Sequence, residues 1–204
     1  MEIDFSSLSP SKRYHLMTQS VIPRPIAWIL SENTDSTLNL APFSYFNAVC
    51  SDPALLMVSV GIKPAGDNKD TARNLQKEHP CVVHIPSVQH ADAVTASAAT
   101  LPYGESELDT IDTTLIEQSD FVLPRLSTCQ IAFNCVVHDV MTIGATPQSL
   151  IFMEIKNMHI ADEVVVQDAK GRDKFDASKI KPLARLGASE FSSISEVFTL
   201  LRPK

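Results

Sequence analysis

Three strand-like runs follow one another closely near the start of the chain. Residues 23–30 begin with prolines and continue as an apolar run, residues 38–45 carry Pro42, and residues 54–60 are almost entirely apolar. Fewer than ten residues separate each run from the next, and this leaves no room for the long crossover that joins parallel strands. The sequence therefore predicts antiparallel pairing here, which limits the fold more than any other feature of the chain.

Pro42 and two later runs extend this prediction. Proline donates no backbone hydrogen bond, so we expect its strand at a sheet edge, a bulge or a transition to a loop. Residues 129–140 and 150–160 are rich in β-branched residues and flank a segment with Gly144 and Pro147, which predicts a hairpin of two long strands. Helices do not alternate regularly with the strands, so we predict a mainly β chain, an antiparallel barrel with helical insertions.

The predicted helices are short. Ser9-Pro10 is suited to begin a helical turn, and Asp70 is suited to be the N-cap of a helix that continues to Glu78. Residues 87–99 are rich in alanine and compatible with a helix. A further helical turn is expected near residues 112–117.

The chain is long enough for one sizeable core, and it contains no internal repeat or low-complexity linker. We expect a single domain over residues 1–204, with excursions at 86–126 and 162–179. Loops on a rigid barrel commonly carry specificity, so these excursions are the expected substrate-selecting segments.

Charge and composition indicate the expected partners. The formal net charge of -7 disfavours general affinity for nucleic acid or anionic lipid. The start of the chain lacks the order of a secretory signal, and no apolar run approaches the roughly 18 residues of a membrane span, so we expect a cytoplasmic protein. The four cysteines form no CxxC pair, which favours buried reduced thiols over a zinc site or a disulfide framework.

Several common catalytic motifs are missing from the sequence. There is no GxGxxG, GxxxxGK[ST], HExxH or GxSxG, and the histidines show no metal-binding spacing. What remains is KDTARN at residues 69–74, where the Lys69 ammonium, the Thr71 hydroxyl and the start of a helix would make an anion-binding corner. In the alternative interpretation, Asp70 only caps a surface helix and Lys69 is solvated.

The stretch Ser44–Pro53 is the second candidate. Its small residues would let a flat ligand approach the backbone, and a broken strand would offer free N–H and C=O groups to the polar edge of a heteroaromatic ring. A buried strand followed by a turn at Asp52-Pro53 is an equally good interpretation of these residues alone.

Taken in order, PRPIAWILS, NLAPFSYFNAVCSDPALLMVSV, KDTARNL and CVVHIPS closely resemble the flavin reductase-like family of FMN-binding split β-barrel proteins. PLARLGASEF at residues 182–191 is similar to the closing motif of that family, so the resemblance covers roughly residues 14–191. It implies an antiparallel split barrel, bound FMN and a homodimer with FMN near the subunit interface.

The resemblance also implies site residues. Residues 47–51 would lie beside the flavin ring and ribityl chain, residues 69–71 would surround the phosphate with Asn74 behind them, and Arg24 would sit close to the flavin. The implied cofactor-binding set is Arg24, Phe46, Asn47, Ala48, Val49, Cys50, Ser51, Lys69, Asp70, Thr71 and Asn74. No catalytic acid or base is required, because the flavin itself carries the hydride.

The chain departs from the family pattern at a few positions. Cys50 stands where serine is common, which weakens a hydrogen-bond donor, and His84 stands where asparagine is frequent. Phe191 replaces a tyrosine, which removes a hydroxyl but keeps an aromatic ring.

The resemblance favours an oxidoreductase that reduces FMN, or a flavin-linked acceptor, with NADH or NADPH. An alternative is an FMN-binding electron-transfer or carrier protein without its own nicotinamide activity. A third is a barrel that has lost flavin and has a structural role.

Overall fold

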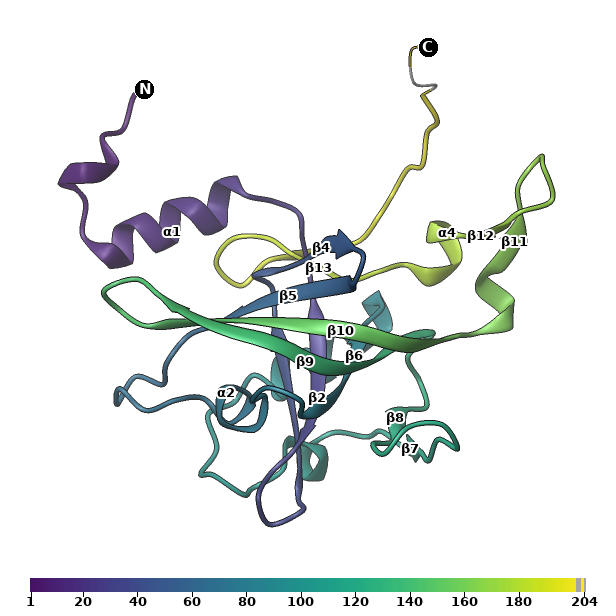
Figure 1. The fold of residues 1–204 in the computed structure, drawn as a ribbon. Helices are drawn as coiled ribbons and strands as arrows, with labels where there is room; N and C mark the ends of the chain where they lie inside the picture. The colour runs from purple at the N-terminus through teal and green to yellow at the C-terminus, as the bar shows by residue number, and fades with distance from the viewer. Residues whose placement is uncertain (201–202, 204) are drawn as a thin grey trace.

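The computed structural model of the protein describes residues 1–200 and 203, and its main element is a seven-stranded antiparallel sheet (Figure 1). Along the sheet the strands follow the order β3-β2-β6-β9-β10-β5-β4. Their bounds are Ala27–Glu32 (β2), Leu38–Phe43 (β3), Phe46–Ser51 (β4), Ala54–Val60 (β5), Pro80–Ile85 (β6), Ile131–Ile143 (β9) and Gln148–Ile160 (β10). The antiparallel pairing and the long β9–β10 hairpin confirm the predictions from the sequence.

The two edge strands of this sheet are consecutive in the chain. β3 pairs with β2 and β4 pairs with β5, and only Ser44 and Tyr45 separate β3 from β4. The chain thus passes from one edge of the curled sheet to the other within two residues, which is the arrangement of a split barrel. Pro42 lies in β3, which is an edge strand of the sheet. Proline has no backbone N–H to donate, and at an edge this does not interrupt the hydrogen bonds between interior strands.

Smaller elements surround the sheet. The short strands form three groups: β1 (Arg24–Pro25), β13 (Ala184–Arg185) and β14 (Phe191–Ser192); β7 (Leu115–Ile116) and β8 (Arg125–Leu126); and β11 (Val165–Gln167) and β12 (Asp173–Phe175). The α-helices are α1 (Pro10–Ser20), α2 (Asp70–Asn74), α3 (Ala91–Ala96) and α4 (Ala177–Ile180), and the 3₁₀ turns are η1 (Phe5–Ser7), η2 (Val88–His90), η3 (Glu107–Thr110) and η4 (Asp162–Val164).

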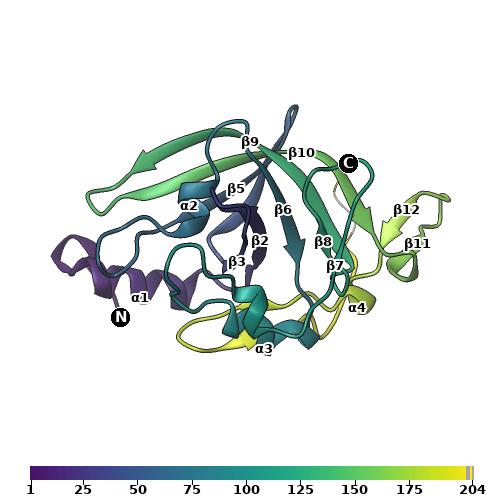
Figure 2. The ribbon, with the colours of Figure 1, turned by 90° about the horizontal axis from the view of Figure 1, so that it is seen from below.

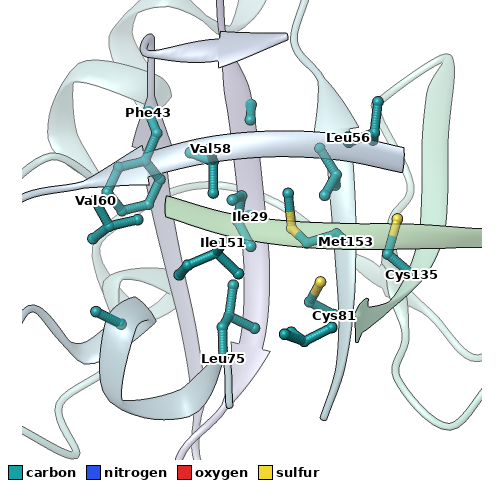
Figure 3. Packing of buried hydrophobic residues seen from close by; sticks show 14 residues of the cluster. Ile29, Phe43, Leu56, Val58, Val60, Leu75, Cys81, Cys135, Ile151 and Met153 are labelled. Carbon is teal, nitrogen blue, oxygen red and sulfur yellow. The ribbon is translucent and has the colours of Figure 1, made fainter. Parts of the chain in front are cut away.

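Strand β2 is buried on both faces, which explains its unbroken apolar sequence. Ile29 points into the interior of the barrel, where it packs with Phe43, Val58 and Met153 (Figure 3). Trp28 points to the opposite face and joins a second core. Because successive side chains of a strand alternate between faces, one strand contributes to both cores.

The excursion at 86–126 covers the second core. In Figure 2 the teal chain of this excursion, with α3, β7 and β8, passes beside β2, β3 and β6. Its Glu107 carboxylate accepts a hydrogen bond from the Leu40 backbone N–H at 3.0 Å, and Ser106 donates to the Leu38 carbonyl. The excursion therefore satisfies backbone groups on the outer edge of β3, a common way to protect an edge strand.

His84 connects β6 to this covering segment. The fully buried ring lies with Nδ1 3.0 Å from the Trp28 carbonyl, and its Nε2 accepts from the Leu126 backbone N–H at 3.0 Å. This pair of contacts requires the neutral ring with the proton on Nδ1. Burial lowers the pKa of His84 from 6.5 to about 4.

Two helix predictions are wrong in detail. The helix that starts at Asp70 ends at Asn74 instead of Glu78, and Lys69 occupies the N-cap position without a side-chain cap. The His79 ring hydrogen-bonds to the Asn74 carbonyl at 2.7 Å. This contact satisfies the last carbonyl of the helix, which ends after one turn. The helical turn expected near 112–117 lies at η3 instead, where the Ser106 hydroxyl caps it.

Three of the four cysteines, Cys81, Cys129 and Cys135, are buried, and Cys50 is exposed; all four are free thiols. Burial raises the pKa of Cys129 to about 12, so this thiol stays protonated.

In the part of the chain that the structure describes, no helix has the length and apolarity needed to cross a bilayer.

Candidate functional site

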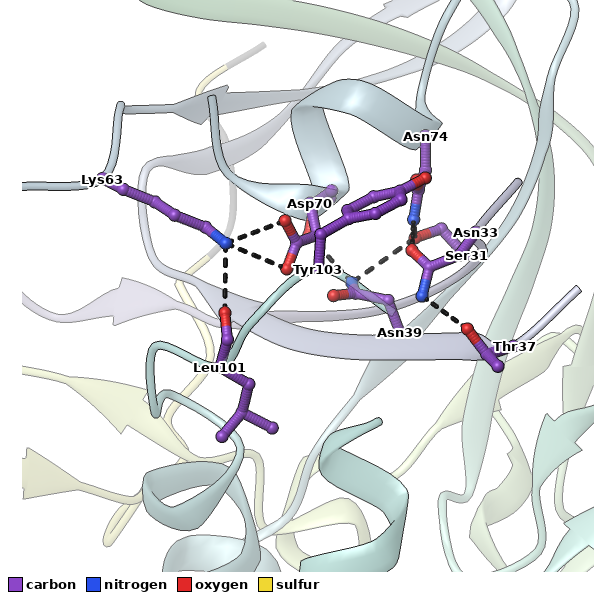
Figure 4. Close-up of polar contacts among 10 residues, drawn as sticks. Ser31, Asn33, Thr37, Asn39, Lys63, Asp70, Asn74, Leu101 and Tyr103 are labelled. Atoms are coloured by element: carbon purple, nitrogen blue, oxygen red, sulfur yellow. Dashed lines mark hydrogen bonds and ion pairs between the residues drawn. The ribbon is translucent and has the colours of Figure 1, made fainter. Parts of the chain in front are cut away.

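Lys69, Asp70 and Thr71 line a small cavity of about 70 Å³ at the start of α2; we call it the lysine corner. Lys63 Nζ lies 2.9 Å from Asp70 Oδ1 and donates to the Leu101 carbonyl at 3.2 Å (Figure 4). Among residues 1–200 and 203, no carboxylate lies within ion-pair distance of the Lys69 ammonium. The corner thus holds one lysine paired with Asp70 and one lysine without an ion pair, and its lining also includes the Glu107 carboxylate, which accepts from the Leu40 N–H.

The surroundings of Lys69 favour an anion. Its Nζ lies 5.6 Å from the centre of the Phe43 ring. Lys69 is exposed as a whole residue, yet desolvation by neighbouring atoms, followed by the charge of Lys63, lowers its pKa. A bound anion would offset both effects. Because α2 has only one turn, this preference rests on the lysine and not on a helix dipole.

A buried polar network supports the corner from below (Figure 4). Asn39 donates to the Thr71 hydroxyl at 3.1 Å, while Asn74 donates to Asn33 Oδ1 at 2.7 Å and to Ser31 at 3.1 Å. Asn74 therefore fixes α2 to β2, and it is not among the residues that line the lysine corner.

Arg24 is buried, and its contacts are structural. The guanidinium donates to the carbonyls of Thr18 at 2.7 Å, Val21 at 2.8 Å and Leu186 at 2.7 Å, and weakly to the Ser44 hydroxyl at 3.4 Å. It thereby joins the end of α1 and the closing segment to the break between β3 and β4. Arg24 reaches the cavities only through Ser44.

The predicted residues of β4 lie apart from the lysine corner. Phe46 is partly buried, whereas Asn47, Ala48, Val49, Cys50 and Ser51 are exposed on the edge strand. None of them lines the lysine corner or the two cavities beside it. Their contact with a flavin stays a prediction.

Three cavities meet at Pro42 and Phe43. The lysine corner is the first, and the second, of about 300 Å³, extends from Phe43 to Arg185 and Phe191. The third, of about 590 Å³, runs between α1 and β5 and also includes Lys69; we call it the α1 groove. Ligand cavities typically have about 300–1,000 Å³, so the larger two fall within the size range of ligand sites.

Sequence reasoning did not assign some residues of the two larger cavities. Phe43 and Ser44 belong to the singled-out block but had no stated role, and Tyr14 and Arg185 come from the two ends of the chain. The position of Arg185 within the closing motif was the only available signal for it. Tyr14 carries none, because its place depends on how α1 packs.

Comparison with known proteins adds independent information. Residues 18–177 match the model of the flavin reductase like domain. An uncharacterized protein of Halalkalibacterium halodurans is 33% identical over 207 residues, covering 100% of this chain and 97% of the relative.

Solved structures agree along nearly the whole chain. Nitrilotriacetate monooxygenase component B from Bacillus cereus superposes with a TM-score of 0.88 at 33% identity, covering 98% of both chains. The 2-nitrobenzoate 2-nitroreductase of Pseudomonas fluorescens gives a TM-score of 0.86 at 27% identity, covering 100% of this chain and 96% of the other.

Proposed function

The chain belongs to the flavin reductase-like family, and on that premise we propose that it binds FMN in the groove around Phe43 and reduces it with NADH or NADPH. The observation that carries this proposal is the uncompensated Lys69 ammonium beside a groove of cofactor size. FMN combines a dianionic phosphate with a large flat ring, and so it needs both features.

The lysine corner would hold the phosphate. Lys69 supplies the charge, and Thr71 supplies a hydroxyl that already accepts from Asn39 and is therefore free to donate to a phosphate oxygen. Asp70 contributes indirectly, because it neutralises Lys63 and leaves Lys69 as the attractive charge.

The ring would lie along the α1 groove. Lys69 lines both this groove and the lysine corner, so a cofactor anchored at the corner extends into the groove past Phe43 and Ser44. FMN, when bound, accepts a hydride equivalent and passes it on. The residues of the groove would orient the ring and exclude water, and the open side would admit the nicotinamide.

Stopped-flow mixing tests the proposed activity. We expect that the FMN-loaded protein loses the absorbance of oxidised flavin when it is mixed with NADH or NADPH without oxygen. If bound FMN stays oxidised with both nicotinamides but is reduced by a protein donor, the chain is a carrier instead. A colourless protein that also fails to quench the fluorescence of added FMN would have the structural role.

We further propose that the protein is a homodimer. Tyr14, Met17 and Val21 expose apolar surface on one side of α1, and Val49 does the same on the free edge strand β4. A second copy that covers these residues would bring Asn47–Ser51 into a protein environment. Light scattering after size exclusion is expected to give twice the chain mass, with Met17→Glu shifting the mass towards the monomer; a monomeric wild type would contradict this.

A further inference from the structure

The cavity that ends at Arg185 has a distinct character. Its walls are mainly apolar and aromatic, and it is defined here as the Arg185 pocket by Tyr14, Ile26, Phe43, Val94, Arg185 and Phe191. Its other lining residues include the hydroxyls of Ser44 and Thr95, and none of its lining residues among positions 1–200 and 203 is acidic. A cation in such surroundings has lost part of its hydration without gaining a counter-ion.

Two contacts, with the Phe191 ring and with the Ala188 carbonyl, hold the Arg185 guanidinium in place. Its Cζ lies 4.5 Å from the centre of the Phe191 ring, and Arg185 faces Phe191 across the β13–β14 pair. It also donates to the Ala188 carbonyl of the same turn. No ion pair of Arg185 occurs within the described ranges, 1–200 and 203. The planar group is thus fixed in orientation, with donors left for a ligand.

From these contacts we propose that the Arg185 pocket is a binding site for a small aromatic carboxylate. A guanidinium binds a carboxylate through two parallel hydrogen bonds, which uses its fork geometry. The three aromatic walls favour a flat ring through stacked and edge-on contacts. A volume of about 300 Å³ suits a single ring rather than a nucleotide.

The pocket is separate from the proposed phosphate anchor. Lys69 lines the lysine corner and the α1 groove but not the Arg185 pocket. The pocket and the groove share Tyr14, Pro42, Phe43 and Ser44, so a ligand at Arg185 lies next to the proposed flavin ring. The adjacency rests on the proposed function, whereas binding of the carboxylate does not.

Calorimetric titration with benzoate tests the site, in full-length protein with and without saturating FMN. We expect one saturable site in both forms, with affinity at least about tenfold lower for Arg185→Gln, the loss of one charge-assisted contact. Benzamide, which lacks the charge, and cyclohexanecarboxylate, which lacks the aromatic ring, should both bind more weakly. Arg172→Gln is the matched control, because Arg172 is paired with Asp168 on the remote β11–β12 hairpin.

The results that overturn the site are distinct. Undetectable benzoate binding, equal affinity for benzamide, or an unchanged benzoate affinity in Arg185→Gln would each contradict a carboxylate site in the Arg185 pocket. Competition between FMN and benzoate would assign the pocket to the flavin ring instead. Arg185→Lys keeps the charge and should recover part of the affinity, which separates a binding role from misfolding. FMN affinity, measured separately by fluorescence quenching, reports on the proposed function alone.

Discussion

Lys69→Ala is expected to weaken FMN binding by about ten- to a hundredfold and to leave riboflavin binding nearly unchanged. The lysine has no carboxylate partner in the described residues, so a phosphate would be its counter-ion. A hydrogen bond to a charged group contributes about 1.5–3 kcal/mol, and each 1.4 kcal/mol is about a tenfold change in affinity. Quenching of flavin fluorescence on titration with protein measures both ligands.

Lys77→Ala is the matched control, because Lys77 is exposed, follows α2 and lines neither the lysine corner nor the α1 groove. It should change neither affinity appreciably. Equal losses for FMN and riboflavin in Lys69→Ala would place the phosphate elsewhere. A pH series adds a second test: because burial and Lys63 lower the pKa of Lys69, FMN affinity should fall at a lower alkaline pH than for an ordinary lysine.

Acidification is expected to destabilise the fold through His84. Its pKa falls from 6.5 to about 4 on folding, so its contribution to stability is complete above pH 6.5 and is lost as the pH falls towards 4. At about 1.4 kcal/mol for each unit of pKa, the loss amounts to about 3 kcal/mol. Urea unfolding at a series of pH values measures it.

Burial also lowers the pKa values of His90 and His159. Variants are therefore needed to separate the contribution of His84 to the pH dependence of stability from theirs. His84→Asn should be less stable at neutral pH, since it loses contacts to the Trp28 carbonyl and the Leu126 N–H, but its stability should depend less on pH between 6.5 and 4. His138→Gln changes an exposed histidine near Glu154 and should follow the wild type. An unchanged pH slope in His84→Asn would show that another group titrates.

The sequence was sufficient to predict most strands, because their patterns are local. Residues 54–60 form β5 as expected, and Pro42 marks an edge strand. The end of α2 was not predictable from propensity, because it depends on the His79 ring reaching the Asn74 carbonyl. The order of the strands could not be predicted either, because no local sequence pattern indicates that β3 and β4 lie at opposite edges of the sheet.

The candidate site shows the same division. KDTARN suggested the anion corner from its composition, and the structure brings Lys69 and Thr71 into one cavity. The role of Arg24 could not be inferred, because its partners Thr18 and Leu186 lie far apart in the sequence. Tyr14 and Arg185 likewise join one pocket only through the packing of α1 and of the closing strands.

The two edges of the sheet differ in how well they resist aggregation. The outer edge of β3 is covered by Ser106 and Glu107, whereas β4 pairs with β5 alone among the described strands and carries no charge or proline to repel an incoming strand. Its only irregularity is the bulge between Ala48 and Cys50. In concentrated preparations, β4 is therefore the template on which a foreign strand would add, and a lysine on this edge would improve solubility at the cost of any contact that β4 makes with a second copy.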